Sequence, residues 1–398
     1  MSLFPKLESR SYKIVIFILF LFGFFGLNVF QISGYHYVTS FILLLIAYMY
    51  KDEVFLYKKY IFLYVCGFII SCVYSSLMNG QPFLLTMSFC NLYIGLTFSL
   101  YLVHKGIPSK ELEKIFIFVA VLFALLYIIQ WMVFPYTLVS SADVLAASDT
   151  EEYRLRIPGS LCAFGLFFFG VNQILLKHKK QGLLYACLGA LPIIIMGFRT
   201  LTLLVVLCSF LMIATVTRKF KKTLWYGILF SLLFIGATNI PIVDDKIQEM
   251  TSRQENEEDA GTENNIRLIA FEYLTDVQFT KPGEKVFGGG IPVMNTRYSQ
   301  ELNSLVTNLH IYWVDIGLIG LSYVLGIPTV LMLCFIYLLC AWRCGQQNLQ
   351  YIRFTAITMV FGSAMTTMEL YRAGNILLFS LLLCIEYKCN CELKEYRK

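Results

Sequence analysis

Arg199 is the only charged residue in a stretch of 35 residues, 183–217. A helix rises about 1.5 Å per residue and a hydrocarbon core of about 30 Å needs roughly 20 residues, so the stretch predicts two membrane crossings that turn over at 197–200. An arginine at a membrane surface costs free energy unless it binds something, and a guanidinium grips phosphate or carboxylate with two parallel hydrogen bonds. The sequence therefore predicts an anion-binding site at Arg199.

Other residues could take part in the same chemistry. Arg372 also lies in a short turn between apolar runs, and Arg267 lies in 264–279, where apolar residues recur at helical spacing. For Arg253 and Arg297 we favour chance in a small set of residues together with surface salt bridges to the acidic stretch 244–263. A histidine side chain has an unperturbed pKa near neutrality, so His310 is a candidate acid or base, although a solvated surface histidine is the commoner case. Competing carboxylate bases are Asp315, Glu272 and Glu369.

The elements that must position these residues are membrane helices. The chain is 58% hydrophobic and only 15% charged, which excludes a soluble domain of 398 residues. We predict an all-α, polytopic helix bundle that forms a single membrane domain over 1–398. About twelve spans are expected, and ten or eleven are also compatible with the sequence: 13–33, 36–50, 60–78, 82–103, 115–135, 158–176, 182–197, 201–217, 223–240, 317–341, 354–368 and 373–387.

Positive charge predicts the orientation of these spans, because loops rich in Lys and Arg stay cytoplasmic. With both termini in the cytoplasm, 22 of the 32 Lys and Arg residues lie inside. The net charge of +6 then reflects topology and does not indicate nucleic-acid binding. Two outer segments remain, a smaller loop at 136–157 and a large, partly helical loop at 241–316. None of the 12 cysteines lies in them, so no disulfide framework is expected.

The outer set of cations is mostly arginine, which the topology rule does not explain. The inner set is mostly lysine, whereas the outer set contains seven arginines and three lysines. The outer residues are Arg154, Arg156, Arg199, Arg253, Arg267, Arg297 and Arg372, and Lys246, Lys281 and Lys285. A planar fork suited to phosphate would explain this bias. The run Gly288-Gly289-Gly290 offers backbone amides that could approach an anion, with a plain loop as the alternative.

Four motifs follow one another in the chain over about residues 154–326. They are Arg156-Ile-Pro-Gly159-Ser160, Gly197-Phe198-Arg199-Thr200, Arg267 with Phe287-Gly288-Gly289-Gly290, and Asn308 through Asp315-Ile316-Gly317-Leu318-Ile319-Gly320. Their order resembles the O-antigen ligase and polymerase superfamily of membrane glycosyltransferases, in particular the Wzy-type O-antigen or capsule polymerases. Many relatives carry a histidine or an Asp-Asn pair at the position of Val306, which is followed here by Thr307-Asn308, and His310 lies four residues after that position.

The resemblance implies a metal-independent enzyme of the bacterial inner membrane that needs no cofactor. Its donor and acceptor would be polyprenyl-diphosphate-linked oligosaccharides at the outer face of the lipid bilayer, and a chain-length regulator protein is a further partner of such enzymes. Arg199, Arg267, Arg372 and Arg156 would hold the diphosphate, and His310, Asp315 or Glu272 would activate the acceptor hydroxyl. No Asp-x-Asp pair occurs in the chain, which argues against the metal-dependent membrane glycosyltransferases.

Two other activities stay open. A ligase, or a protein O-oligosaccharyltransferase, would move the same glycan onto lipid A core or onto a protein hydroxyl, and the sequence hardly separates it from a polymerase. A flippase for the lipid-linked repeat would also have about twelve spans. Flippases, however, need charges along a central cavity and internal symmetry, and neither is visible here.

Overall fold

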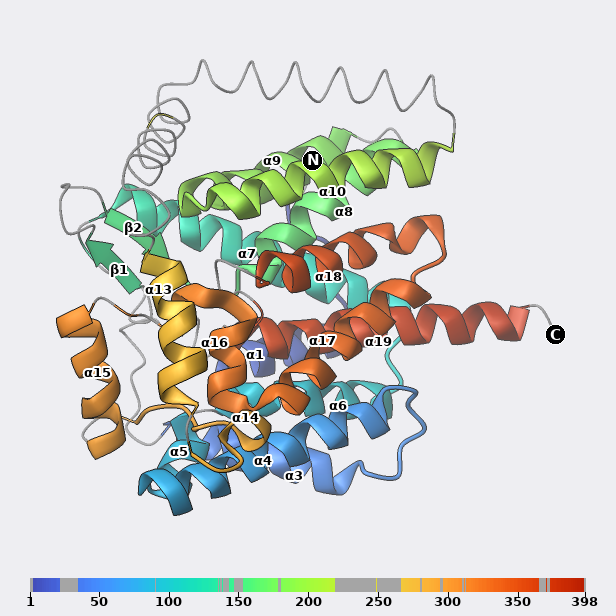
Figure 1. The fold of residues 1–398 in the computed structure, drawn as a ribbon. Coiled ribbons are helices and arrows are strands. Elements are labelled where there is room, and N and C mark those ends of the chain that lie inside the picture. Colours follow the sequence, from blue (N-terminus) through green and yellow to red (C-terminus); the bar gives the residue numbers. More distant parts are fainter. Residues whose placement is uncertain are drawn as a thin grey trace. The chain divides into compact units, whose positions relative to one another are not determined.

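The computed structural model describes residues 3–21, 35–89, 91–134, 136, 138, 143–146, 153–177, 180–218, 248, 266–279, 281–293, 296–309, 311, 313–364, 370 and 373–396. These residues are predominantly helical (Figure 1). The chain divides by its internal contacts into two compact units. The first consists of Met1–Gln31, Lys110–Asp259 and Cys340–Met359, and the second of Ile32–Ser109, Ala260–Leu339 and Val360–Lys398.

The first unit is built around two long helices that approach each other closely. A Cβ added at Gly189 would lie 2.4 Å from the backbone nitrogen of Phe167, and one at Gly170 would lie 2.3 Å from that of Ala186. Small residues at these positions let α8 and α9 pack backbone against backbone. The elements of this unit are α1 (Ser9–Leu21), α7 (Ser109–Met132), β1 (Asp143–Ala146), β2 (Tyr153–Arg156), α8 (Leu161–Lys177), α9 (Lys180–Met196), α10 (Arg199–Thr217), η6 (Gln347–Leu349) and α18 (Gln350–Gly362).

The second unit packs its C-terminal helix against a tight 3-10 segment. Gly95 allows this contact, because a Cβ there would lie 2.9 Å from the Cα of Leu377. The elements are α3 (Tyr35–Met49), α4 (Lys58–Asn79), α5 (Phe83–Phe89), η2 (Asn91–Thr97), α6 (Phe98–His104), α13 (Ile266–Glu272), the π-helical η4 (Tyr273–Gln278), α14 (Glu284–Phe287), α15 (Arg297–Leu309), η5 (Trp313–Ile316), α16 (Gly317–Leu325), α17 (Ile327–Arg343) and α19 (Ala373–Tyr396).

Most helices lie where the sequence predicts spans, but two predicted spans are broken. The predicted span 82–103 is divided into α5, η2 and α6. The hydroxyl groups of Thr97 and Ser99 donate to carbonyls three residues earlier, at 2.8 and 2.6 Å, which favours the tight 3-10 geometry. The predicted span 317–341 is divided at Gly326, whose φ of +82° is outside the helical range. The predicted span 223–240 lies outside the described residues.

The described residues confirm the all-α class, and a small antiparallel hairpin is the one β element among them. It lies in the predicted outer loop 136–157, where β1 pairs with β2 in the register Asp143 opposite Arg156 and Ala146 opposite Tyr153. The predicted helix at 264–279 is confirmed, since α13 and η4 together run from Ile266 to Gln278.

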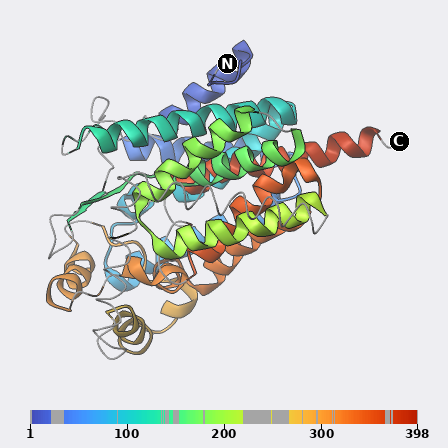
Figure 2. The same cartoon turned by 90° about the horizontal axis from the view of Figure 1, so that it is seen from above.

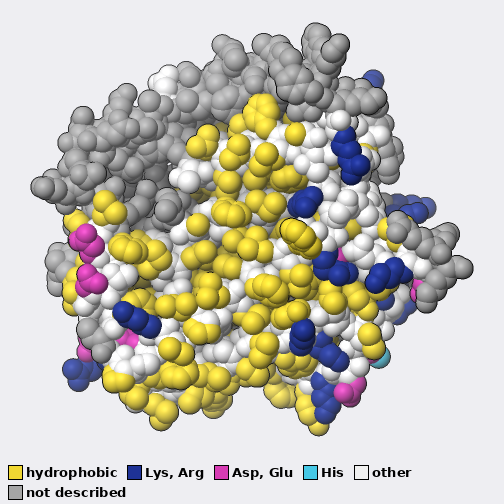
Figure 3. Space-filling model, turned by 45° about the vertical axis from the view of Figure 1, so that its right-hand side comes forward, with side chains coloured by type: hydrophobic (Ala, Val, Ile, Leu, Met, Phe, Trp, Pro, Cys, Tyr) yellow, Lys and Arg dark blue, Asp and Glu magenta, His cyan; other side chains and the backbone are white. Residues whose placement is uncertain are grey.

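The long helices are apolar on their exposed sides as well as on their buried sides. On α4, Leu63 and Leu77 are 57% and 77% exposed, while Tyr64 and Phe68 are fully buried. On α10, Leu203, Leu207 and Leu211 are exposed at four-residue spacing. On the face drawn in Figure 3 the exposed side chains are mostly hydrophobic. A helix that is hydrophobic all round needs an apolar medium on its outer face, and a lipid bilayer is one.

Three of the described helices are long and apolar enough to cross a membrane, as judged by length and composition: Lys58–Asn79, Ser109–Met132 and Thr200–Thr217. Shorter apolar helices of 10 to 17 residues accompany them. The fold is therefore compatible with a membrane protein, and the count of twelve crossings stays a prediction.

Candidate anion-binding site

The turn between α9 and α10 places Arg199 at the first position of a helix. Gly197 makes this turn with a φ of +67°, and its amide donates to the carbonyl of Ile194 at 3.0 Å. Phe198 follows in extended conformation as the N-cap residue of α10, and no side chain caps the helix. The first amide inside the helix to find its acceptor is that of Thr202, which donates to the carbonyl of Phe198 at 2.9 Å.

The start of α10 carries the positive end of the helix dipole. The amides of Arg199, Thr200 and Leu201 have no acceptor within the helix, and the helix dipole adds about half a positive charge at this end. Helices ordinarily place Asp or Glu there, but the first turn of α10 has no acidic residue. An arginine at this position is unfavourable by itself, so backbone and residue type together make the turn a candidate anion site.

The hairpin that carries Arg156 lies beside this turn. Strand β2 contacts α9, and Figures 1 and 2 both show the β1–β2 hairpin next to the turn that joins α9 to α10. Arg156 is the last residue of β2, and Gly159, with a φ of +106°, leads the chain into α8. Two of the four arginines predicted to hold a diphosphate therefore belong to neighbouring elements of the first unit.

The other predicted residues belong to the second unit. Helix α13 carries Arg267 near its start and Glu272 as its last residue, and it packs against η5, which contains Asp315. Successive residues of a helix are about 100° apart, so Glu272 lies about 140° around the axis from Arg267, and the two do not share a face. Glu272 is exposed. His310, Arg372 and Glu369 lie outside the described residues.

The glycine run 288–290 is not an anion site, which corrects that hypothesis. The amide of Gly289 donates to the carbonyl of Tyr323 at 2.7 Å, and the amide of Gly290 donates to the carbonyl of Val324 at 3.0 Å. These two carbonyls lie just before the break at Gly326. The last carbonyl groups of helix α16 have no hydrogen-bond donor within the helix. The glycine amides thus stabilise the helix break and are not available to a ligand.

Only glycine fits at two of these positions. A Cβ at Gly288 would lie 2.3 Å from the carbonyl oxygen of Val324, and a Cβ at Gly290 would lie 2.1 Å from Oγ of Ser75. Both glycines also have positive φ, of +79° and +85°. The loop 281–293 is therefore fitted against α4 and the end of α16.

A buried polar cluster, which the sequence did not predict, completes this contact. Glu284 is 1% exposed and Tyr298 is 2% exposed. The hydroxyl group of Tyr298 donates a hydrogen bond to that of Tyr323 at 2.9 Å. The carboxylate of Glu284 accepts a hydrogen bond from the backbone amide of Lys281 at 3.3 Å. Burial raises the pKa of Glu284, although the amide and charge of Lys281 lower it. Burial also raises the pKa of Tyr298 well above its ordinary value, with Tyr323 contributing.

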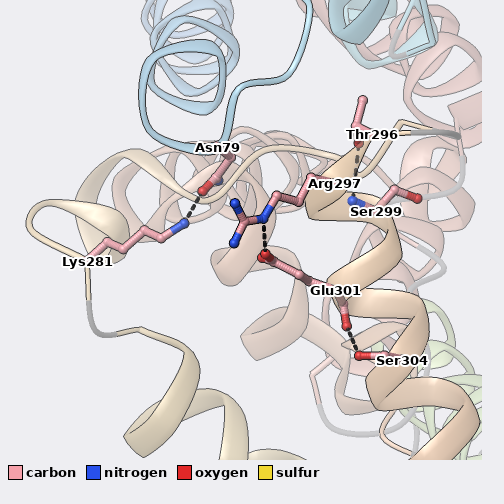
Figure 4. A network of polar contacts seen from close by, with 7 residues as sticks. All are labelled: Asn79, Lys281, Thr296, Arg297, Ser299, Glu301 and Ser304. Carbon is pink, nitrogen blue, oxygen red and sulfur yellow. Dashed lines mark hydrogen bonds and ion pairs between the residues drawn. The ribbon is translucent and has the colours of Figure 1, made fainter.

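Exposed contacts surround the buried cluster. Figure 4 shows Lys281 reaching Oδ1 of Asn79, whose amide group donates to the carbonyl of Gly289 at 2.6 Å. Figure 4 also shows Arg297 paired with Glu301, with Nε to Oε1 at 2.9 Å. Arg297 thus has an acidic partner at the surface, but the partner lies on its own helix and not in the acidic stretch of the prediction. Within the described part of the chain, no group of three His, Cys, Asp or Glu side chains lies close enough to hold a metal ion.

Comparison of the sequence with models of known protein families and with curated proteins finds no match.

Proposed function

We propose that the protein is a membrane glycosyltransferase that joins polyprenyl-diphosphate-linked oligosaccharide repeats into an O-antigen or capsular polysaccharide. The observation that carries this proposal is the start of α10, where Arg199 occupies an uncapped helix N-terminus without an acidic residue in the first turn. A diphosphate is an anion that such a start would bind, and the sequence resemblance selects it among the anions. The sequence resemblance to Wzy-type polymerases and the exposed apolar sides of the helices support the same function.

The reaction defines what the residues must do. The acceptor hydroxyl oxygen forms a bond to the anomeric carbon of the donor glycan, and the bond from that carbon to the diphosphate oxygen breaks. The proton of the acceptor hydroxyl goes to a base, for which His310, Asp315 and Glu272 are the candidates. The leaving polyprenyl diphosphate gains negative charge, which Arg199 and the first amides of α10 would stabilise, with Arg156, Arg267 and Arg372 as further cations.

The expected loss of polymerisation activity depends on the kind of contact that a substitution removes. Removing one preorganised donor from a group that gains charge in the transition state typically lowers kcat by about 100-fold to 1,000-fold. Arg199→Ala should lower polymerisation by at least that factor, because it removes both a charge and a bidentate donor. Arg199→Lys keeps the charge but loses the planar fork, so it should restore only part of the activity.

The test uses the full chain, purified in detergent and supplied with a lipid-linked oligosaccharide repeat. The matched control is Arg297→Ala, which removes an arginine whose side chain is paired with Glu301 at the surface. The control should give the ladder of long products that the unchanged chain gives. A normal ladder from Arg199→Ala in protein that is still folded and membrane-inserted would refute the assignment.

The same assay separates the alternative activities. Polymerisation needs no sealed compartment, so products formed in detergent exclude a flippase as the explanation. In a deletion strain, a polymerase defect leaves single repeats on the final acceptor, whereas a ligase defect leaves long chains on the polyprenyl lipid. The second result would replace the polymerase assignment by the ligase.

A further inference from the structure

One end of the second unit carries lysines that lie over tyrosine rings. The ammonium group of Lys51 lies 5.0 Å from the ring centroid of Tyr48, just after helix α3 ends. The ammonium group of Lys105 lies 5.2 Å from the ring centroid of Tyr101, at the end of helix α6. The two helices pack against each other, so both pairs belong to one local surface.

Aromatic contacts join the two pairs. Tyr50 lies between them in the contact network, with its ring centroid 6.0 Å from that of Tyr101 and 4.4 Å from that of His104. His104 in turn contacts Glu53, with Nδ1 to Oε1 at 2.6 Å. The carboxylate of Glu53 is therefore engaged by the histidine, and each lysine lies over a ring.

The exposed side of α3 leads up to this surface. Val38, Phe41, Leu45 and Tyr48 are all exposed, and their spacing of three or four residues places them on one face of the helix. A lysine beyond the end of such a face, with its ammonium over a tyrosine ring, has the arrangement of a side chain at the boundary between hydrocarbon and headgroups. The apolar face suits acyl chains, and the two lysines suit a phosphate.

We propose that the ends of α3 and α6 form a binding site for an anionic phospholipid, with Lys51 and Lys105 contacting its phosphate and the tyrosines framing it. The helix dipole favours lysines at helix C-termini, but it gives no reason for the tyrosines or for the apolar face that ends there. A zwitterionic lipid would bind less well, because its own cation competes with the lysines. The proposal rests on the membrane location in the proposed function and not on glycosyl transfer.

The test is native mass spectrometry of the full chain in detergent, titrated with phosphatidylglycerol or with phosphatidylcholine of the same acyl chains. Each lysine near an anionic lipid contributes roughly 1 kcal/mol, or about fivefold in affinity. Lys51→Gln with Lys105→Gln should therefore weaken phosphatidylglycerol binding by about 25-fold, the product of two such factors. Phosphatidylcholine binding should change little. Asp52→Asn, which removes an exposed acid beside Lys51, should strengthen phosphatidylglycerol binding.

The control carries the same change of charge at two exposed lysines elsewhere, Lys180→Gln with Lys285→Gln, and should bind as the unchanged chain does. Lys51→Arg with Lys105→Arg should keep the preference, which separates loss of charge from loss of fold. Equal binding of the two lipids by the unchanged chain would overturn the proposal, as would a preference that survives in the double Gln variant. Competition by millimolar inorganic phosphate would show a site for free phosphate and would also overturn it. Loss of polymerisation in Arg199→Ala bears on none of these outcomes.

Discussion

Gly289→Ala provides a sharp test of how the loop 281–293 is held. The Cβ of the alanine would lie 2.4 Å from the hydroxyl oxygen of Tyr298 and 3.1 Å from Oε1 of Glu284. Tyr298 is buried and has little room to move. Displacing its hydroxyl group by about 1 Å breaks the hydrogen bond to Tyr323, worth about 1 kcal/mol, and overpacking adds about 1 to 3 kcal/mol. We expect the free energy of unfolding to fall by about 2 to 4 kcal/mol.

A double-mutant cycle shows whether the hydroxyl group is the cause. Tyr298→Phe alone loses one buried hydrogen bond and should cost about 1 kcal/mol. In the variant that carries both Gly289→Ala and Tyr298→Phe, the hydroxyl oxygen 2.4 Å from the added Cβ is absent. The next atom of the ring, Cζ, lies 3.3 Å from that Cβ, and a small shift relieves this contact. The two changes together should therefore cost less than the sum of the single changes, by about 1 to 2 kcal/mol.

The measurement is equilibrium unfolding of the purified chain in mixed micelles, followed by helical circular dichroism. Gly345→Ala is the control, because no atom lies within 4 Å of the Cβ that it would add. It should change the free energy of unfolding by less than about 0.5 kcal/mol. Strictly additive costs for Gly289→Ala and Tyr298→Phe would refute the close contact on which the argument depends.

Two further predictions concern the same unit. Burial raises the pKa of Glu284 above its ordinary value of 4.5, so the folded state favours the protonated form; its contribution to stability is fully present below pH 4.5 and is lost as pH rises through the folded-state pKa. Unfolding measured across this window should show a loss of stability with rising pH that Glu284→Gln abolishes, and an unchanged slope in that variant would contradict the reasoning. Gly317→Ala should destabilise by about 3 kcal/mol or more, because a Cβ at a φ of +58° would lie 2.3 Å from the carbonyl oxygen of Ser363, whose backbone cannot move as a side-chain end can. If Gly317→Ala unfolds at the same midpoint as the unchanged chain in this assay, the close contact with Ser363 is refuted.

Composition and periodicity predicted much of the local structure. A helix needs only its own residues to form its hydrogen bonds, so apolar runs such as 60–78 and 201–217 correspond closely to α4 and α10. The turn before Arg199 was also predictable, because a glycine and a lone charge interrupt an otherwise apolar stretch. The hairpin was not predicted, because each strand has only four residues: Tyr153–Arg156 alternates apolar and charged residues over too short a run, and Asp143–Ala146 does not alternate.

For the candidate site, the sequence predicted which residue types lie on which elements, but not which side chains the fold brings together. An isolated arginine is easily recognised in an apolar sequence, because a charged side chain at a membrane costs free energy unless it is bound. Glu284 gives no such signal: it lies among polar loop residues, and only the fold shows that it is buried beside Tyr298. The pKa of a carboxyl group depends on neighbours from other elements, and their identity is not written in the adjacent sequence.

The break at Gly326 shows most clearly why local reasoning is incomplete. Residues 317–341 read as one apolar helix, yet the chain takes a φ of +82° at Gly326 and starts a second helix. The carbonyl of Val324 then accepts hydrogen bonds from the amide of Gly290 at 3.0 Å and from the hydroxyl group of Ser71 at 2.9 Å. A helix break in apolar surroundings is stable only when such groups find donors. The donors come from residues 34 or more positions away, so the break is a property of the assembled unit, and changing Gly290 should disturb α16 as much as the loop itself.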